Sequence, residues 1–357
     1  MTSNSTLSID DLLDYFDIKE DEPPKRVRNE TIIFGGPFVY FVGVVGNVLA
    51  LTVMPHFARR VSTYMYLLVL CILDLCVLHL GLLVIWLREI LEIDLHSLSS
   101  FSCKTLTFLG YVCSDSSVWL VMAVTFERFM TMCHPLKATS LCRVRQAVFI
   151  IILILVFILL INLHIFWTIG LMPDSNNSTV CGQRKDITLI WPYVDLLVYF
   201  VIPFLSTGIF NYKIIRKIRG MKRNSQLNIS LTNVKAFMTK KTNVRKKLTV
   251  MMVILSLTFV ITTFPMVCML CVTAVLKTLS QPIDINRQLF NKMFSFAELL
   301  MFTNHAVNFY LYVASSRKFR KALRQVLCEC KVSDSSVFER SENKYSNNFV
   351  AADTLYS

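Results

Sequence analysis

The chain has 357 residues, of which 54% are hydrophobic and 17% are charged. Together with a mean hydropathy of +0.53, this composition excludes an ordinary soluble domain and indicates an integral membrane protein. The formal net charge of +13 is explained by basic loops that orient membrane helices, so no nucleic-acid partner is expected. Eleven cysteines are too few for a disulfide scaffold.

Seven apolar segments are long enough to span a bilayer. They cover residues 32–54, 64–88, 101–133, 146–171, 189–215, 247–277 and 289–313. Lysine and arginine cluster after the first, third, fifth and seventh segments, and by the positive-inside rule these connections are cytoplasmic. We therefore predict an all-α integral membrane protein of the plasma membrane, a seven-transmembrane helix bundle whose amino terminus is extracellular.

These segments divide the chain into four parts. Residues 1–31 are predicted to form an acidic, glycosylated extracellular segment. Residues 32–313 form the transmembrane bundle, with a basic cytoplasmic loop at 216–246. Residues 314–330 are predicted to form a short amphipathic eighth helix, and 331–357 a disordered cytoplasmic tail. Serines in the tail are candidate phosphorylation sites that would attract arrestin-like partners.

Several residues in the predicted loops fit this orientation. Asn-X-Ser/Thr sequons in extracellular segments mark four candidate glycosylation sites, Asn4, Asn29, Asn176 and Asn177. Cys103 and Cys181 both face the oxidising compartment, so a disulfide between them is expected. On the cytoplasmic side, Cys328 and Cys330 are candidate palmitoylation sites that would anchor the chain to membrane lipid.

The same segments bear on whether the chain is an enzyme or a transporter. His79, His164 and His305 lie in different helices without metal-ligand spacing, so each is interpreted as a packed, hydrogen-bonded side chain. No nucleophile or metal constellation is present, and no enzymatic activity is predicted. The chain also lacks the half-chain repeat and paired broken helices of many transporters. A transporter or channel that shares seven helices nevertheless stays open as an alternative.

Motifs in several helices together resemble those of the rhodopsin-like (class A) G-protein-coupled receptors. The matching residues are Gly46-Asn47, Leu73-Asp74, Cys103, Glu127-Arg128-Phe129, Pro203, Phe259, Pro265, the run Asn308 to Tyr312, and Phe319. The segment from Cys133 to Ala138 is similar to peptide receptors of the thyrotropin-releasing-hormone and invertebrate FMRFamide type. The resemblance implies a receptor that binds an extracellular peptide, such as a neuropeptide, and activates a heterotrimeric G protein.

The resemblance also assigns roles to individual residues. It implies G-protein coupling through Glu127, Arg128, Phe129 and Tyr312, with Arg128 held inward by Glu127 at rest. It implies a packing relay through Pro203, Val118, Phe259, Pro265 and Asn308, in which Pro265 is the hinge. Some residues depart from the family pattern. Thr263 replaces the usual switch tryptophan, and Arg245 and Asn211 exclude an ionic lock of the usual kind.

A polar site in the middle of the bundle is implied by the same resemblance. Asp74, Ser117, Asn304 and Asn308 would surround a hydrated sodium ion, whose charge offsets the desolvation of the carboxylate. No other cofactor is expected. A water-filled hydrogen-bond network without an ion is the alternative, and His305 is not the residue usually found beside this site.

The ligand class is narrowed by exclusion. Gly110 stands where amine receptors carry an aspartate, and Phe302 stands where opsins carry a lysine. A large, partly polar ligand fits better, with Trp86, Arg88, Asp195 and Glu298 as candidate contacts. A receptor for a lipid or another small molecule stays open as an alternative to the peptide receptor.

Overall fold

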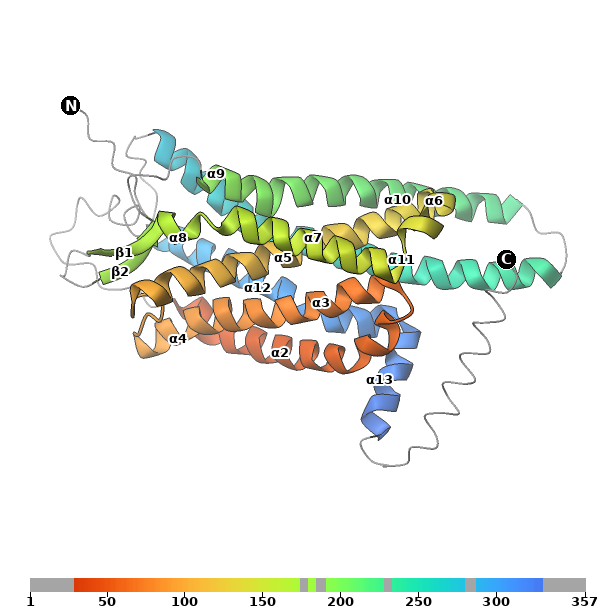
Figure 1. The fold of residues 1–357 in the computed structure, drawn as a ribbon, viewed down its shortest axis with the longest axis horizontal. Coiled ribbons are helices and arrows are strands. Elements are labelled where there is room, and N and C mark those ends of the chain that lie inside the picture. Colours follow the sequence, from red (N-terminus) through yellow and green to blue (C-terminus); the bar gives the residue numbers. More distant parts are fainter. Residues whose placement is uncertain (1–28, 174–178, 184–190, 228–232, 280–286, 330–357) are drawn as a thin grey trace.

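The computed structural model describes residues 29–173, 179–183, 191–227, 233–279 and 287–329. Within these ranges the chain forms an elongated bundle of long helices, with a two-stranded β-hairpin at one end (Figure 1). We call this end the hairpin end. At the opposite end the helix α13 (Arg317–Glu329) turns across the bundle, and we call it the α13 end.

Seven long helical segments make up the described part of the bundle. The first is α2 (Glu30–Ala58), and the second is α3 (Ser62–Val77), which continues through the π-helix η1 (Leu78–Leu83) into α4 (Val84–Leu91). The third is α5 (Ser100–Cys133), and the fourth is α7 (Val144–Asn162) followed by α8 (Ile165–Thr168). The fifth is α9 (Trp191–Asp195), which continues through the π-helix η2 (Leu196–Val201) into α10 (Ile202–Leu227), and the last two are α11 (Asn233–Leu279) and α12 (Arg287–Ser315). A short helix α6 (Pro135–Leu141) follows α5.

Six of these segments are long and apolar enough to cross a membrane. The remaining one, α12, has 29 residues but carries Asn304, His305 and Asn308, which are at most 4% exposed. Polar side chains that face the interior of the bundle lower the hydropathy of a helix without presenting polar groups to lipid. The predicted fold class, an all-α membrane bundle of seven helices, is confirmed.

A polar side chain caps the start of α5, and another bonds to a π-helical turn. The Ser99 hydroxyl accepts from the Ser102 amide at 3.0 Å and caps the start of α5. The wide turn of η2 frees backbone groups from the regular α-helical pattern. The Trp119 indole on α5 donates to the Val198 carbonyl of η2 at 3.0 Å, which joins the two helices at this turn.

Helices α2 and α12 approach each other closely. A Cβ atom on Gly43 would lie 3.0 Å from the backbone Cα of Ala306, so only glycine fits at this crossing. Four residues further along α2, the Asn47 amide donates to the backbone carbonyl of His305 at 2.9 Å. These two contacts fix the height of α12 against α2.

The hairpin closes one end of the bundle. Strand β1 (Ile169–Pro173) pairs antiparallel with β2 (Thr179–Gln183), and Leu171 lies opposite Cys181. The predicted disulfide is confirmed, because Cys181 is bonded to Cys103 at the start of α5 with a Cα–Cα distance of 5.5 Å. The hairpin is thereby fixed to the third long segment of the bundle.

The loop between α4 and α5 supports the disulfide. The Ser97 hydroxyl accepts from the Cys181 amide at 3.0 Å and donates to the Asp94 carboxylate at 2.6 Å. Hydrogen bonds from His96 and from Ser97 hold the pKa of the Asp94 carboxyl well below its usual range. The ionised carboxylate therefore helps to order the loop against the hairpin.

Helices α10 and α11 are longer than the predicted spans. The basic connection was placed at 216–246, and within it α10 continues to Leu227 and α11 begins at Asn233, so residues 216–227 and 233–246 are helical. Lysine, arginine and glutamine favour helix, and helical hydrogen bonds persist in water after a chain leaves the membrane. Hydropathy marks the end of the apolar span and does not mark the end of the helix.

The predicted eighth helix corresponds to α13. Its residue Phe319 is fully buried, with ring centroids 5.8 Å from Tyr312 and 5.9 Å from Phe309. Cys328 is exposed in the last turn of α13. Cys330, the sequons at Asn4, Asn176 and Asn177, the first 28 residues and the tail lie outside the described residues.

Candidate functional site

Near the α13 end, an arginine is held inside the bundle. Arg128 and Glu127 are 6% and 5% exposed. The Arg128 guanidinium donates to the Glu127 carboxylate and to the Thr63 hydroxyl, and the Thr63 hydroxyl donates to Glu127 at 2.5 Å. An unpaired buried charge is costly, so this network keeps Arg128 inward, as predicted for the resting state.

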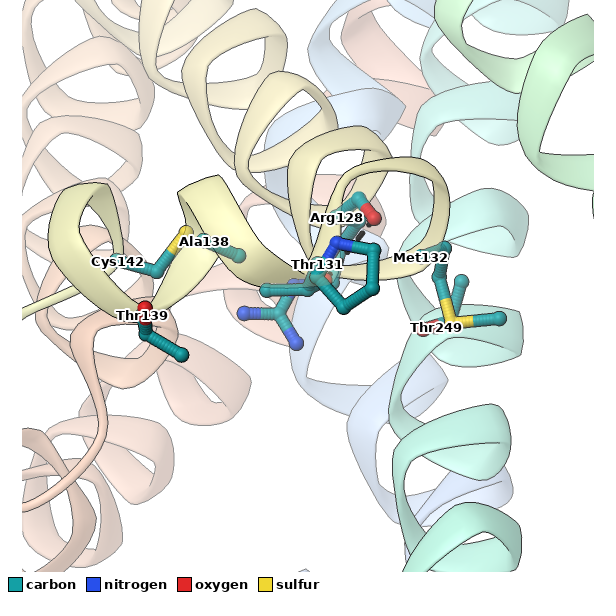
Figure 2. A pocket seen from close by; sticks show the side chains of 8 residues that line it. Arg128, Thr131, Met132, Ala138, Thr139, Cys142 and Thr249 are labelled. Atoms are coloured by element: carbon teal, nitrogen blue, oxygen red, sulfur yellow. Dashed lines mark hydrogen bonds between the residues drawn. The ribbon is translucent and has the colours of Figure 1, made fainter. Parts of the chain in front are cut away.

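Arg128 lines a pocket between α5, α6 and α11, and Figure 2 shows its side chain between Cys142 on one side and Thr249 on the other. The lining residues are Arg128, Thr131, Met132, Pro135, Ala138, Thr139, Cys142 and Thr249. Thr249 belongs to α11, so movement of α11 away from α5 would widen the pocket and expose Arg128.

Phe129 and Tyr312, also predicted to act in coupling, pack at the same end. The Phe129 ring stacks on Phe210 of α10, with 5.4 Å between the ring centroids, and the Lys213 ammonium lies 5.5 Å from the centre of the Phe129 ring. Tyr312 is fully buried against Phe319. Phe129 therefore joins α5 to α10, and Tyr312 joins α12 to α13.

A neutral pair joins α10 to α11. The Asn211 amide donates to the Ser256 hydroxyl at 2.8 Å, and the hydroxyl lies 3.1 Å from the Asn211 carbonyl oxygen. Their exposed fractions are 3% and 0%. From the sequence we could say only that Asn211 replaces a residue usual in the family. Its partner Ser256 was not predicted, because which side chains meet across two helices depends on how the helices are rotated.

The predicted relay residues lie in the interior of the bundle. Val118 and Phe259 are each 1% exposed and belong to one apolar core cluster. Pro203 is buried on α10, and Pro265 interrupts the hydrogen bonding in the interior of α11. Asn308 does not belong to this apolar cluster, because its amide bonds to Asp74.

The polar centre of the bundle is built on Asp74 of α3, which is completely buried. Ser117 of α5 donates to Asp74 Oδ1 at 2.9 Å, and Asn308 of α12 donates to Oδ2 at 2.6 Å. His305 Nδ1 lies 2.8 Å from Oδ1, and the hydrogen is assigned to Nδ1 because the carboxylate accepts. The structure therefore brings together Asp74, Ser117 and Asn308, as predicted, and adds His305.

The residues around Asp74 do not fit the predicted sodium ion. A hydrated ion needs several oxygen atoms with free lone pairs, whereas three donors already occupy most of those on the carboxylate. Asn304 is buried, yet none of the described hydrogen bonds of Asp74 involves it. The imidazole of His305, the residue expected to depart from the family pattern beside this site, occupies the side of the carboxylate that an ion would require.

Two predicted ligand contacts, Trp86 and Arg88, have partners within the chain at the hairpin end. The Trp86 indole donates to the backbone carbonyl of Ile33 on α2 at 3.2 Å. Arg88 lies 3.8 Å from Glu89, its neighbour on α4. Both side chains are only partly exposed. The Trp86 contact joins α4 to α2, and the Arg88 contact lies within α4. We therefore interpret Trp86 as a structural residue in the first instance.

Asn29, predicted to carry a glycan, caps α2. Its carbonyl oxygen accepts from the Ile32 amide at 3.4 Å, and its amide nitrogen donates to Ser295 on α12. Its backbone amide donates to Glu89 at 3.2 Å. The nitrogen that would carry a sugar is thus in contact with a buried residue, and glycosylation at Asn29 would require this contact to break.

A second acidic centre lies between α5, α7 and α9. The Asp115 carboxylate, 5% exposed, accepts from the Asn162 amide at 2.7 Å. His164 Nε2 lies 3.5 Å from Asp195 Oδ1, and its ring is stacked on Trp191 with 3.9 Å between the ring centroids. The Asp195 side chain is 31% exposed, so this carboxylate is accessible from the hairpin end. We call Asp115, Asn162, His164 and Asp195 the outer acidic centre.

Glu298, the other predicted acidic contact, lies on α12 and is partly buried. It interacts electrostatically with Arg88 and Glu89 of α4. Asp195 and Glu298 are therefore on separate helices, α9 and α12. Sequence reasoning identified both carboxylates as candidates. It did not identify Asn162 as the partner of Asp115, or His164 as the partner of Asp195, because the sequence of an apolar helix does not show which residue of the next helix lies opposite.

The chain belongs to the rhodopsin family of seven-transmembrane receptors, whose family model matches residues 46–312. This range contains the Arg128 pocket, the Asp74 centre and the outer acidic centre. Among curated proteins, the chain is similar to the thyrotropin-releasing hormone receptor of Mus musculus, with 27% identity over 81% of this chain and 77% of the relative. It is 23% identical to the FMRFamide receptor of Drosophila melanogaster, over 86% of this chain and 56% of the relative. It is 25% identical to the somatostatin receptor type 2 of Mus musculus, over 86% and 80%.

Proposed function

We propose that this receptor binds an extracellular peptide at the hairpin end and activates a heterotrimeric G protein at the α13 end. The observation that carries the proposal is the Arg128 pocket, in which a buried arginine is bonded to Glu127 and the wall opposite is formed by Thr249 of α11. The relatives named for thyrotropin-releasing hormone, FMRFamide and somatostatin support a peptide as the ligand. No enzymatic activity of its own is part of this proposal.

The proposed orientation puts the hairpin end outside the cell, in the plasma membrane. The disulfide between Cys103 and Cys181 at this end supports an oxidising surrounding. Basic residues near the α13 end, including Arg59, Arg60, Arg317 and Lys318, support a cytoplasmic location for that end. The exposed Cys328 is the proposed anchor to membrane lipid, and arrestin-like proteins are proposed partners of the serine-rich tail.

Asp195 and Glu298 are the proposed contacts for basic or hydrogen-bonding groups of the peptide. Asp195 is the better placed of the two, since its carboxylate is partly exposed and its described ion-pair partner is a histidine at 3.5 Å. A cationic group of the ligand would neutralise this carboxylate in surroundings of low dielectric, where the interaction is stronger than in water.

A peptide-library calcium screen in cells that express the full chain tests the proposal. We expect at least one peptide to activate wild type and not the Arg128→Ala variant at equal surface expression, with affinity changed only a few fold. Arg59→Ala, which removes an exposed arginine at the same end, is the matched control and should signal normally. Equal responses from the Arg128 variant would contradict the proposed coupling.

The two alternative functions make different predictions in the same cells. A channel or transporter would produce agonist-independent ion flux without G-protein activation. A receptor for a membrane lipid would keep its full response after deletion of residues 2–28, which leaves the Asn29 cap intact. We expect no such flux, and we expect the deletion to weaken the response to the peptide.

A further inference from the structure

The Asp74 centre contains a residue whose function the family membership does not assign. His305 is 1% exposed and bonds to the same carboxylate oxygen as Ser117, through Nδ1 at 2.8 Å. Its Nδ1 also lies 3.4 Å from the Ser117 hydroxyl. With Asn308 on the second oxygen at 2.6 Å, side chains from two other helices donate three hydrogen bonds to a carboxylate on a third.

The position of the imidazole is fixed by the backbone as well as by its own bonds. Asn47 donates to the backbone carbonyl of His305 at 2.9 Å. The next residue, Ala306, packs against Gly43 so closely that a Cβ there would clash. Because α12 cannot shift along α2 at this level, the ring cannot leave the carboxylate by a small movement of its helix.

A sodium ion at this place would have to displace the imidazole. The ring fills the space beside Oδ1 and directs an N–H toward it, and a positive ion next to an N–H donor is repelled. Displacement would leave the buried ring without its acceptor, and a buried polar group without a partner is costly. The ion would gain few oxygen ligands in return, because the Asn308 amide presents its nitrogen to Asp74.

We infer that His305 takes the place of a sodium ion in this receptor, and that this single residue makes the Asp74 centre insensitive to sodium. The inference requires the ring to fill the space and to donate from Nδ1, and it does not depend on a second proton on the imidazole. The resting arrangement of α3, α5 and α12 is then held by side chains alone.

The test measures the unfolding temperature of the purified full-length receptor in sodium chloride and in N-methylglucamine chloride, both at about 0.15 M. Wild type should unfold at the same temperature in both salts. His305→Ser replaces the ring by a small oxygen ligand and opens space for an ion. Sodium should then raise the unfolding temperature of the variant by about 2–4 °C, because a ligand that binds only the folded state stabilises it by mass action.

Two controls separate the effect of His305 from a general loss of packing. His164→Ser makes the same change at another buried histidine and should remain insensitive to sodium. Adding Asp74→Asn to His305→Ser should abolish the gained response. If His305→Ser does not fold, His305→Ala is measured in its place with the same expectation.

The inference would be overturned if sodium raised the unfolding temperature of wild type. It would also be overturned if His305→Ser and His305→Ala both folded and sodium raised the unfolding temperature of neither. The measurement uses neither agonist nor G protein. Its failure therefore leaves the proposed peptide receptor untouched, whereas failure of the peptide screen leaves the sodium result standing.

Discussion

The two acidic centres of the bundle differ in how completely their carboxylates are satisfied. Asp74 is fully buried and accepts three hydrogen bonds from two neighbouring helices. Asp195 is 31% exposed and lies 3.5 Å from a histidine nitrogen that has no hydrogen-bond partner among the described residues. A buried carboxylate bonded to two other helices holds those helices in place, whereas a partly exposed carboxylate with fewer bonds is suited to a ligand.

The largest expected effect, a loss of stability, follows from removing the Asp74 carboxylate. Asp74→Ala leaves the donors on Ser117, His305 and Asn308 without an acceptor, and breaking such a buried network costs about 3–5 kcal/mol. We expect the unfolding temperature of the purified receptor to fall by about 10 °C. An unchanged unfolding temperature would contradict the structural function assigned to this centre.

The second prediction removes the carboxylate of the open centre. Asp195→Asn keeps the shape of the side chain and removes its charge, so the loss of a charge-assisted hydrogen bond of about 2 kcal/mol should reduce agonist potency roughly 30-fold. The unfolding temperature should change little, since the side chain is partly exposed. Concentration-response curves on the peptide found by the screen measure the effect, and equal potency would remove Asp195 from the ligand site.

The third prediction extends the comparison to the neutral pair between α10 and α11. Ser256→Ala removes the hydroxyl that bonds to Asn211, a loss of about 1 kcal/mol. If this pair holds α11 in the resting position, basal nucleotide exchange on the G protein should rise about five-fold. Thr258→Ala, which removes a hydroxyl bonded only within α11, is the control and should leave basal exchange unchanged.

The smallest expected effect concerns a carboxylate outside the membrane. The pKa of Asp94 is lowered in the folded chain, chiefly by hydrogen bonding from His96. Its contribution to stability is therefore fully present above the unfolded pKa, near 4, and is lost as the pH falls through the folded value. Asp94→Asn should lower stability by no more than about 1 kcal/mol. The difference from wild type should shrink as the pH falls below 4.

Much of the bundle is predictable from the sequence because a membrane helix is a long, apolar run of residues. An apolar run of sufficient length, basic connections and two cysteines on one side were enough for the seven segments and the disulfide. The pair Glu127 and Arg128 was also predictable, since both residues sit in one motif on one helix. Each of these signals lies within a single segment or its flanks.

Contacts between helices were less accessible to sequence reasoning. The sodium prediction put Asn304 in the set around Asp74 and His305 only near it, whereas in the structure His305 bonds to the carboxylate. A single position on α12 turns the side chain by about 100°, so the choice depends on helix rotation and local packing. The π-helical turns in η1 and η2 shift the rotation of everything beyond them, and nothing in their composition marks them.

Because α11 is long, a small rotation at Pro265 gives a large displacement at its first residues. Pro265 lies 32 residues from the start of the helix at Asn233 and 16 residues from Thr249 in the pocket wall, distances of about 48 Å and 24 Å at 1.5 Å per residue. If α11 pivots at Pro265 by about 10°, the wall moves about 4 Å and the tip moves about 8 Å. A partner that touches the tip therefore experiences twice the stroke available at Arg128, and shortening the helix would reduce that gain without altering the pocket.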